Sequence, residues 1–349
     1  MTDDIERYQH ALLTTLERAH AVGYSGYSKF DGLLSPVTQA LSFGWWPLRL
    51  AWTQLVMHAP MNVRPWLRVR QGVNPEGPAL FAHANLACVE MGESGPLAER
   101  AQQCLDGLLR HDASAYGDYH GRCWGYHHPW QSTGFYQPPH FPNCYMTAIV
   151  GGALLHGYRV LERVEYLEAA RSAADFMLHD LHVFQEDDEA KCIAYVPHMR
   201  TQLQVVNINA LAGAFLAQVG TATDERSLFI QARKLMAFVA RHQTSYGAWY
   251  YTTEPRQSLV THDNYHTGMI LDALWAYEQE RLPMTAQIVR MNRKGGPEGV
   301  IDVVEELAPN GFTRIDEVLS HDQRMSIVRG YASTAGFSKE QVNKAAKAA

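Results

Sequence analysis

Charged residues are scarce in this chain of 349 residues: they make up 19% of it, whereas hydrophobic residues make up 46%. The formal net charge is −6, and no long basic segment stands out. This charge balance argues against a dedicated nucleic-acid-binding protein. The hydrophobic fraction is large enough to build a sizeable core, in one large domain or two smaller ones.

The cysteines lack a pattern. There are five of them, and none forms a CxxC pair. An odd, scattered set is typical of reduced and mostly buried thiols rather than of a disulfide framework. The five are Cys88, Cys104, Cys123, Cys144 and Cys192.

Long apolar runs are also missing. The N-terminal segment MTDDIERYQH is acidic and has no apolar signal core. No uninterrupted run approaches the roughly 18 to 20 apolar residues that cross a bilayer. We therefore expect a cytoplasmic protein without a transmembrane segment.

Cofactor motifs are absent as well. The chain has no P-loop, no glycine-rich dinucleotide fingerprint and no nucleophile elbow. His262 and His266 have the spacing of a zinc-binding pair on a helix, but the glutamate of that motif and a third ligand are not evident. We expect neither a metal nor another cofactor.

What the chain has in abundance is helical periodicity, while strand-like alternation is scarce. Most of the predicted helices form successive pairs joined by loops rich in glycine and tyrosine. The expected helices cover 2–22, 46–58, 79–92, 96–111, 144–161, 164–182, 203–219, 224–243 and 264–281.

Three of these helices resemble one another: MTAIVGGALLHGYRVLE, NINALAGAFLAQVG and HTGMILDALWAYEQ. Each is apolar nearly all round, so it must be buried between layers. Their predicted starts, Thr147, Asn209 and Thr267, are 62 and 58 positions apart. Buried helices alternating with half-polar ones at a near-constant period predict an all-α fold, an (α/α) toroid of helical hairpins. The N-terminal ends of the inner helices should converge on one cleft.

The C-terminal part breaks this pattern. We predict a toroid domain over 1–284 and a divergent helical tail over 285–349, with the last hairpin incomplete or diverged. Short amphipathic helices are expected in the tail at 300–307, 312–320, 321–333 and 338–348.

The aromatic residues gather in connecting loops together with Gln, Asn and His. Aromatic rings stack on the C–H faces of sugars, and the polar groups pair with the hydroxyls, so these loops predict a saccharide cleft. Plugging of the ends of the toroid is the structural alternative. The predicted substrate-binding residues are Trp124, Tyr126, Trp130, Gln131, Tyr136, Tyr250 and Asn264.

The segment THDNYHTG at 261–268 places acid–base groups at the start of a helix. We predict Asp263, His266 and Asp31 as the catalytic residues, with Asp263 as the first choice of acid or base. Glycosidic cleavage would need a second carboxylate, for which Asp31, Glu254 and Asp118 are candidates. Lyase or epimerase chemistry would instead need a His or Tyr base. The alternative without catalysis is that Asp263 caps the helix and the histidines bind loops.

Four loop and helix segments carry a family resemblance: GYSGYSKFDGLLSP, CWGYHHPWQS, NINALAGAFLA and WYYTTEPRQSLVTHDNYHTGMILDAL. They resemble segments of the VpsJ-type proteins of bacterial exopolysaccharide and lipopolysaccharide gene clusters, over about residues 20 to 280. More distantly, the chain is similar to six-hairpin toroid enzymes that act on polysaccharides, including the glucuronyl C5-epimerase type. The resemblance implies a toroid with a role in making or modifying surface polysaccharide.

Three hypotheses follow. The first is an enzyme, a hydrolase, lyase or epimerase acting on an oligosaccharide or polysaccharide. The second is a non-catalytic saccharide-binding or scaffold protein that works with polysaccharide assembly proteins. The third is a toroid that acts on a terpenoid or prenyl chain, and the many Gln, Asn and His residues in the loops speak against it.

Overall fold

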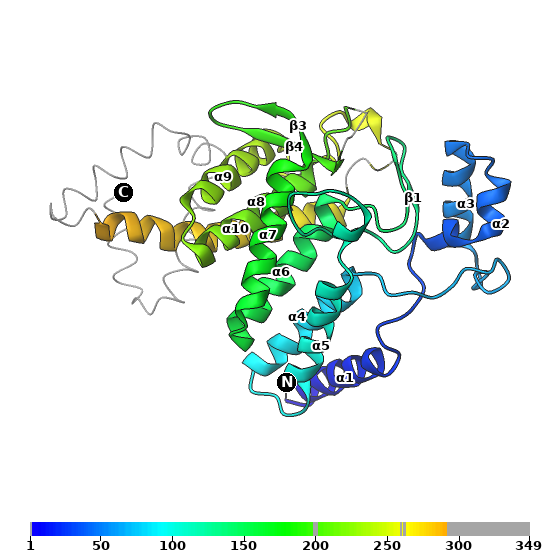
Figure 1. Ribbon diagram of the computed structural model, residues 1–349, viewed down its shortest axis with the longest axis horizontal. Helices are drawn as coiled ribbons and strands as arrows, with labels where there is room; N and C mark the ends of the chain where they lie inside the picture. Colours follow the sequence, from blue (N-terminus) through cyan, green and yellow to red (C-terminus); the bar gives the residue numbers. More distant parts are fainter. Residues whose placement is uncertain (1, 198–201, 259, 261–262, 292–349) are drawn as a thin grey trace. The chain divides into compact units, whose positions relative to one another are not determined.

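The computed structural model describes residues 2–197, 202–258, 260 and 263–291 (Figure 1). His262 and all four helices predicted for the tail lie outside these ranges. Helices dominate the described part, in agreement with the predicted all-α class. No helix in this part is both long and apolar enough to cross a membrane.

Three helical hairpins follow one another along the chain. In each hairpin the first helix packs against the second, and the first helices also pack side by side, α4 against α6 and α6 against α8. The helices are α4 (Glu76–Glu90), α5 (Leu97–Arg110), α6 (Cys144–Leu161), α7 (Val164–His179), α8 (Val206–Thr223) and α9 (Arg226–Arg241), followed by α10 (Asn264–Met291).

Burial separates an inner from an outer layer. The inner helices α6 and α8 are buried over most of their length, whereas the outer helix α9 buries a single stripe. The inner helices approach closely at Gly151, where a Cβ atom would lie 2.4 Å from the ring of Phe215. This alternation of inner and outer helices confirms the predicted (α/α)-toroid class.

The expectation for α10 was partly wrong. We predicted a helix buried on every side, but among its residues 264–280, whose burial the structure describes, only Ile270, Ala273 and Tyr277 are buried in the core. On its other face Leu271 is 53% exposed and Trp275 is 69% exposed. An apolar sequence therefore marks a face that can be covered, and whether it is covered depends on the neighbouring elements.

The polar residues from which the repeat was counted lie inside the inner helices. The predicted ranges give the first residues of α6 and α10 correctly, Cys144 and Asn264, and place that of α8 at 203, three residues before Val206. Thr147, Asn209 and Thr267 each lie three residues after the first residue of their helix. Thr147 and Asn209 bond to preceding segments of the chain instead of capping. The hydroxyl of Thr147 accepts the backbone N–H of Trp124 at 3.1 Å, and the amide oxygen of Asn209 accepts that of Ile193 at 2.9 Å. This offset is the same in all three helices, so their spacing is unchanged.

Two β-hairpins were not predicted. β1 (Trp130–Gln131) pairs with β2 (Tyr136–Gln137), and β3 (Leu181–Glu186) pairs with β4 (Lys191–Pro197), both antiparallel. β4 is buried along its whole length. A continuous buried run has no alternation, so its periodicity does not distinguish it from a short helix.

The N-terminal part contains α1 (Thr2–Ala21), the 3-10 helix η1 (Asp31–Leu34), α2 (Pro36–Leu41) and α3 (Trp46–His58). We call residues 29–70 the α2–α3 lobe. The sequence predicted α3 but missed the six-residue helix α2. Ser35 caps α2 by accepting the backbone N–H groups of Val37 and Thr38. α3 packs against η1 and β1, which connects the lobe to the hairpin between α5 and α6.

The chain divides into two compact units, Met1–Arg281 and Leu282–Ala349. The predicted boundary at 284 falls within α10 and stays a prediction, as does the divergence of the last hairpin.

Candidate functional site

A pocket of about 550 Å³ lies where the inner helices begin. Its lining includes residues from the first turn of each of α4, α6, α8 and α10, so the N-terminal ends of the inner helices converge as the sequence predicts. The volume falls within the range typical of small-molecule sites. These first-turn residues are Glu76, Tyr145, Asn207, Tyr265 and His266.

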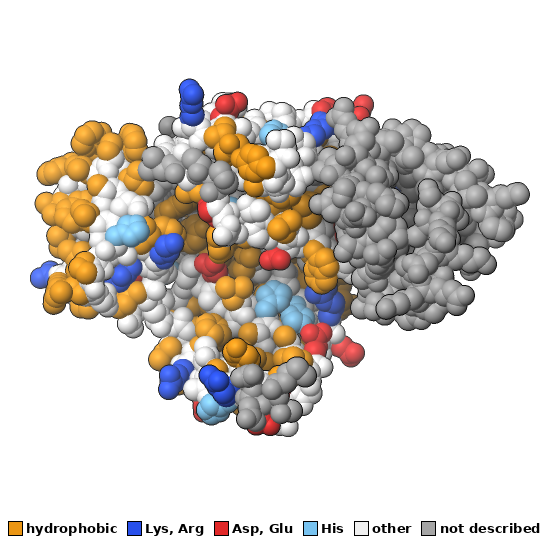
Figure 2. Space-filling view, turned by 180° about the vertical axis from the view of Figure 1, so that it is seen from behind, with side chains coloured by type: hydrophobic (Ala, Val, Ile, Leu, Met, Phe, Trp, Pro, Cys, Tyr) orange, Lys and Arg blue, Asp and Glu red, His pale blue; other side chains and the backbone are white. Residues whose placement is uncertain are grey.

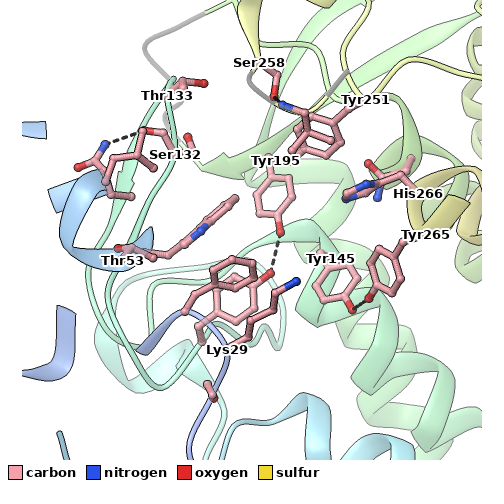
Figure 3. Close-up of a pocket in the computed structure, with 18 of the residues that line it drawn as sticks. Lys29, Thr53, Ser132, Thr133, Tyr145, Tyr195, Tyr251, Ser258, Tyr265 and His266 are labelled. Atoms are coloured by element: carbon pink, nitrogen blue, oxygen red, sulfur yellow. Dashed lines mark hydrogen bonds between the residues drawn. The ribbon is translucent and has the colours of Figure 1, made fainter. Parts of the chain in front are cut away.

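Tyrosines form much of the wall. Tyr126 of the loop before β1 and Tyr195 of β4 hydrogen-bond to each other through their hydroxyls at 2.8 Å. Burial raises the pKa of both well above the usual value, and it does the same for Tyr145 and Tyr251. These four phenols are therefore neutral at physiological pH and serve as hydrogen-bonding groups rather than as bases. In Figure 3 Tyr145, Tyr195 and Tyr251 surround one space from different elements.

Glu76 is a carboxylate inside this pocket. The hydroxyl of Tyr145 donates to its Oε1 at 2.6 Å and lies 3.3 Å from the hydroxyl of Tyr265. The amide of Asn74 donates to the other carboxylate oxygen at 3.3 Å. Two helix starts, those of α4 and α6, thus share a charge-assisted hydrogen bond at the pocket wall.

His266 and Asp263 form an oriented pair at the start of α10. Asp263 Oδ2 lies 2.8 Å from the ring Nδ1 of His266, and Asp263 Oδ1 accepts the backbone N–H of His266 at 2.8 Å. Burial raises the pKa of Asp263, but these hydrogen bonds from His266 outweigh it, so the pKa lies below the usual value. Asp263 is therefore ionised, and the Nδ1–H of His266 donates to it. This tautomer leaves Nε2 as an acceptor.

His266 lines the pocket, whereas Asp263 does not. The ring of His266 lies 4.7 Å from that of Tyr251 and 5.3 Å from that of Tyr265, measured between centroids. Figure 3 shows His266 beside Tyr251 and Tyr265 at the edge of the pocket. An imidazole whose Nδ1 is held by a carboxylate is an arrangement suited to general base catalysis.

The remaining walls come from the α2–α3 lobe and from the loops. Leu50, Thr53 and Gln54 on α3 line one side, together with Lys29. In Figure 3 Thr53 lies on the side of the pocket opposite His266. The pocket is thus bounded by the lobe on one side and by the inner helices on another.

Three amide side chains in the lining keep an unused acceptor. The amide oxygens of Asn74, Gln131 and Asn207 are buried and have no hydrogen-bond partner among the described residues. The amide of Gln131 is held by the carbonyl groups of Ser132 and Phe135, at 2.8 and 3.2 Å. An unpaired buried acceptor costs about 1 to 3 kcal/mol, so hydroxyl donors would be favoured here.

Four of the predicted residues line this pocket: Tyr126, Trp130, Gln131 and His266. Trp130 places its ring centroid 5.9 Å from that of Tyr126 and 5.7 Å from that of Tyr195. The first pair is edge-to-face and the second is tilted, and such ring contacts fix the rings that a sugar face would meet.

Other predicted residues lie elsewhere. Trp124 is 1% exposed, and its indole N–H donates to the carbonyl oxygen of Leu108 at 3.0 Å, so it is a core residue. Tyr136 lies under the guanidinium of Arg49, 4.2 Å from its ring centroid. Tyr250 hydrogen-bonds to Tyr246, and Asn264 is exposed at the first position of α10. None of these four lines the pocket.

Asp31 is fully buried and paired. Its Oδ1 accepts the Nε–H of Arg64 at 2.7 Å, and its Oδ2 accepts the backbone N–H of Ser28 at 2.9 Å. Asp31 therefore holds the base of the α2–α3 lobe and does not line the pocket. The other candidate carboxylates, Asp118 and Glu254, are exposed outside it.

The sequence reasoning missed Glu76, Tyr145, Tyr195 and Asn207. Tyr145 and Asn207 occupy the second position of α6 and α8, and Tyr265 occupies that of α10. The signal was the period of the inner helices. Counted from the first residue of each helix rather than from Thr147, Asn209 and Thr267, the repeat would have selected these positions.

Among the residues that the structure describes, no group of three or more His, Cys, Asp or Glu side chains is arranged to hold a metal ion. The five cysteines are all buried free thiols, as predicted.

No protein-family model and no curated protein matches this chain. Solved structures with a similar fold include a D-mannose isomerase, at 13% identity and a TM-score of 0.42, covering 59% of this chain and 54% of that one. A GH76 α-mannanase of Bacteroides thetaiotaomicron matches at 16% identity and 0.44, covering 72% and 69%. A sugar epimerase from a ruminal bacterium matches at 12% identity and 0.41, covering 61% and 60%.

The chain spans only about half the length of the D-mannose isomerase. All three structures have a low sequence identity to this chain and a low TM-score. A function therefore has to be argued from the site itself.

Proposed function

We propose that this chain is a carbohydrate-active enzyme in which His266, oriented by Asp263, moves a proton at a sugar carbon. The observation that carries the proposal is the His266–Asp263 pair at the edge of a tyrosine-lined pocket, with Nδ1 and Oδ2 2.8 Å apart. A substrate class follows from the walls. Aromatic rings suit the C–H faces of a sugar, and the amide oxygens and neutral phenols suit its hydroxyls.

The geometry favours proton transfer over hydrolysis by two carboxylates. Asp263 uses both oxygens on His266, which makes it a positioning group rather than an acid or a nucleophile. The raised pKa values of Tyr126, Tyr195 and Tyr251 disfavour a tyrosinate base. The base in this reading is His266, and the roles that we predicted for Asp263 and His266 are exchanged.

In the proposed reaction His266 Nε2 takes the proton from a carbon next to a carbonyl or carboxylate group. The C–H electron pair then passes to the adjacent carbonyl oxygen to form an enolate. Return of a proton to the opposite face, from a neutral phenol of the wall or from water, inverts the carbon, as in an epimerase, and His266 then releases its proton to water. Expulsion of a neighbouring oxygen substituent forms a C=C bond, as in a lyase.

The sequence resemblance supports a surface polysaccharide, or an oligosaccharide precursor of one, as the substrate. A scaffold that binds saccharide without reaction is the second candidate, because Asp263 Oδ1 also makes the hydrogen bond expected of a helix cap.

Deuterium incorporation tests this proposal. The protein is incubated in D₂O with a panel of uronate-containing and neutral oligosaccharides, and the recovered sugars are analysed by mass spectrometry. With the wild type we expect either one deuterium per turnover, as for an epimerase, or an unsaturated sugar without deuterium, as for a lyase, and we expect neither product with His266→Gln. His10→Gln, which changes an exposed histidine on α1, should behave as the wild type.

Two results would decide against proton transfer at carbon. Incorporation of oxygen from ¹⁸O-labelled water at the anomeric carbon, without deuterium at any carbon, would indicate a hydrolase. Equal saccharide binding by the wild type and His266→Gln, with no change in the sugar, would indicate the scaffold.

A further inference from the structure

The outer face of the α2–α3 lobe exposes an unusual number of large apolar side chains. Figure 2 shows them gathered over the lobe, at the left of that view, with Lys and Arg side chains at the edges. Exposed apolar area on this scale marks an interaction surface. The exposed fractions are Phe43 83%, Trp66 71%, Leu55 62%, Trp45 58%, Met61 58%, Trp46 49% and Leu41 46%.

The lobe also buries residues of its own. Its inner face buries Leu33, Thr38, Thr53 and Val56. Gly32 approaches so closely that a Cβ atom there would lie 3.0 Å from Cβ of Val56. The apolar outer face is thus a surface remaining after the lobe has packed.

The lobe is also the basic part of an acidic chain. Residues 29–70 contain Lys29, Arg49, Arg64, Arg68 and Arg70 but only one acidic residue, Asp31, which gives five minus one, or +4. Because the whole chain carries −6, the remainder carries −10. The single carboxylate is buried against Arg64. Lys29, Arg68 and Arg70 are exposed.

We propose that the α2–α3 lobe docks on an anionic lipid bilayer surface. Trp and Phe side chains prefer the interface between headgroups and acyl chains, and nearby Arg and Lys side chains bind anionic headgroups. The lobe exposes both kinds of residue, with apolar, Lys and Arg side chains visible together on it in Figure 2, and it has no exposed carboxylate among residues 29–70. A symmetric pairing with a second copy would instead bring two +4 surfaces together, which like-charge repulsion opposes.

The position of the lobe connects this surface with the pocket. Leu50, Thr53 and Gln54 of α3 line the pocket, and Leu55 and Trp46 of the same helix are on the exposed face. Lys29 lines the pocket as well. Under the proposed function, this arrangement suits a saccharide carried on a lipid. The inference of a lipid-linked saccharide rests on the proposed function, whereas docking on the bilayer does not.

Vesicle sedimentation of the full chain tests the docking. We expect the protein to sediment with phosphatidylcholine vesicles containing about 30% phosphatidylglycerol, and to bind pure phosphatidylcholine at least about tenfold more weakly. Trp45→Ser with Trp66→Ser, and separately Arg68→Glu with Arg70→Glu, should each weaken binding at least about tenfold. The thermal melting curve of each variant confirms its folding, because all four positions are exposed.

Matched controls lie outside the lobe. Trp275→Ser on α10, where the side chain is 69% exposed, and Arg110→Glu on α5 should bind as the wild type. The proposal would be overturned if these controls lost vesicle binding to the same extent as the lobe variants, or if the wild type did not bind anionic vesicles. So would a dimer in light scattering that the Trp45 and Trp66 changes dissociate, since that result would assign the surface to a second copy. His266→Gln should retain vesicle binding, which separates failure of docking from failure of the proposed function.

Discussion

The carboxylate of Asp263 makes two hydrogen bonds of 2.8 Å with His266, accepting the backbone N–H with one oxygen and binding the ring Nδ1 with the other. The same side chain therefore caps α10 and selects the tautomer that presents Nε2. Asp263 therefore has both a structural role and a chemical role, so a substitution there has to be tested for its effect on stability and on the reaction rate.

Asp263→Asn should separate these roles. An Asn side chain still accepts the backbone N–H, so we expect the free energy of unfolding to change by less than about 1 kcal/mol. It no longer provides the charged acceptor for the ring, and we expect the rate of the sugar reaction to fall about 100-fold or more. Chemical denaturation and steady-state kinetics provide the two measurements.

The control for this change is Glu254→Gln, an equivalent substitution of an exposed carboxylate outside the pocket. It should alter neither quantity. A fully active Asp263→Asn variant would reduce Asp263 to a helix cap and remove the support for an oriented base.

Tyr145→Phe tests the polar link between the helix starts. The change removes the hydrogen bond of 2.6 Å to Glu76 and the contact of 3.3 Å with Tyr265. A hydrogen bond to a charged group contributes about 1.5 to 3 kcal/mol, so saccharide binding or turnover should weaken about tenfold or more. Calorimetric titration and kinetics would show it, and Tyr8→Phe, at a side chain 76% exposed, is the matched control. Wild-type affinity and rate in Tyr145→Phe would exclude this link from the working site.

Asp31→Asn should affect stability first. Breaking a buried ion pair leaves the guanidinium of Arg64, 14% exposed, without its partner, at a cost of about 3 to 5 kcal/mol. Asp175→Asn, which removes a half-exposed partner of Arg171, should cost less than about 1 kcal/mol. Urea denaturation gives both values. Normal stability combined with lost turnover would instead restore Asp31 to the catalytic group that the sequence suggested.

The stability of the protein should fall in mild acid. Burial, followed by the neighbouring His156 and Arg159, lowers the pKa of His83 from 6.5 to about 4. Between these values the unfolded chain binds a proton that the folded chain does not bind, so stability decreases as the pH falls from about 6.5 towards 4.

Melting temperatures near pH 7 and near pH 5 check this sign. The decrease between the two should be smaller in His83→Asn than in the wild type, because the variant has lost the titrating group. His10→Asn should keep the decrease of the wild type, since His10 is exposed. An unchanged decrease in His83→Asn would assign the acid sensitivity to other groups.

Much of the helical framework follows from local sequence. Period and apolar content placed α3, α6 and the inner–outer alternation correctly, because burial of a helix face imposes its spacing on the residues of that helix. The convergence of the inner helix starts also follows, since hairpins of similar length bring equivalent ends to the same side.

The tertiary structure decided which residues contact one another. Trp124 and Trp130 stand in one aromatic loop, yet the first binds Leu108 in the core and the second faces the pocket. Tyr195 reaches Tyr126 from a strand that the sequence did not indicate, across 69 positions.

The apolar pattern of a helix determines that a face prefers to leave water, but it does not determine what covers that face. The sequence by itself therefore determined the helices, their inner and outer layers and the aromatic content of the loops. Only the tertiary structure decided that Asp31 binds Arg64 rather than a substrate, that Glu76 enters the pocket, and that Trp45, Trp66 and Trp275 remain exposed. These outcomes depend on contacts between distant segments, and such contacts do not produce a periodic pattern in the sequence of either segment.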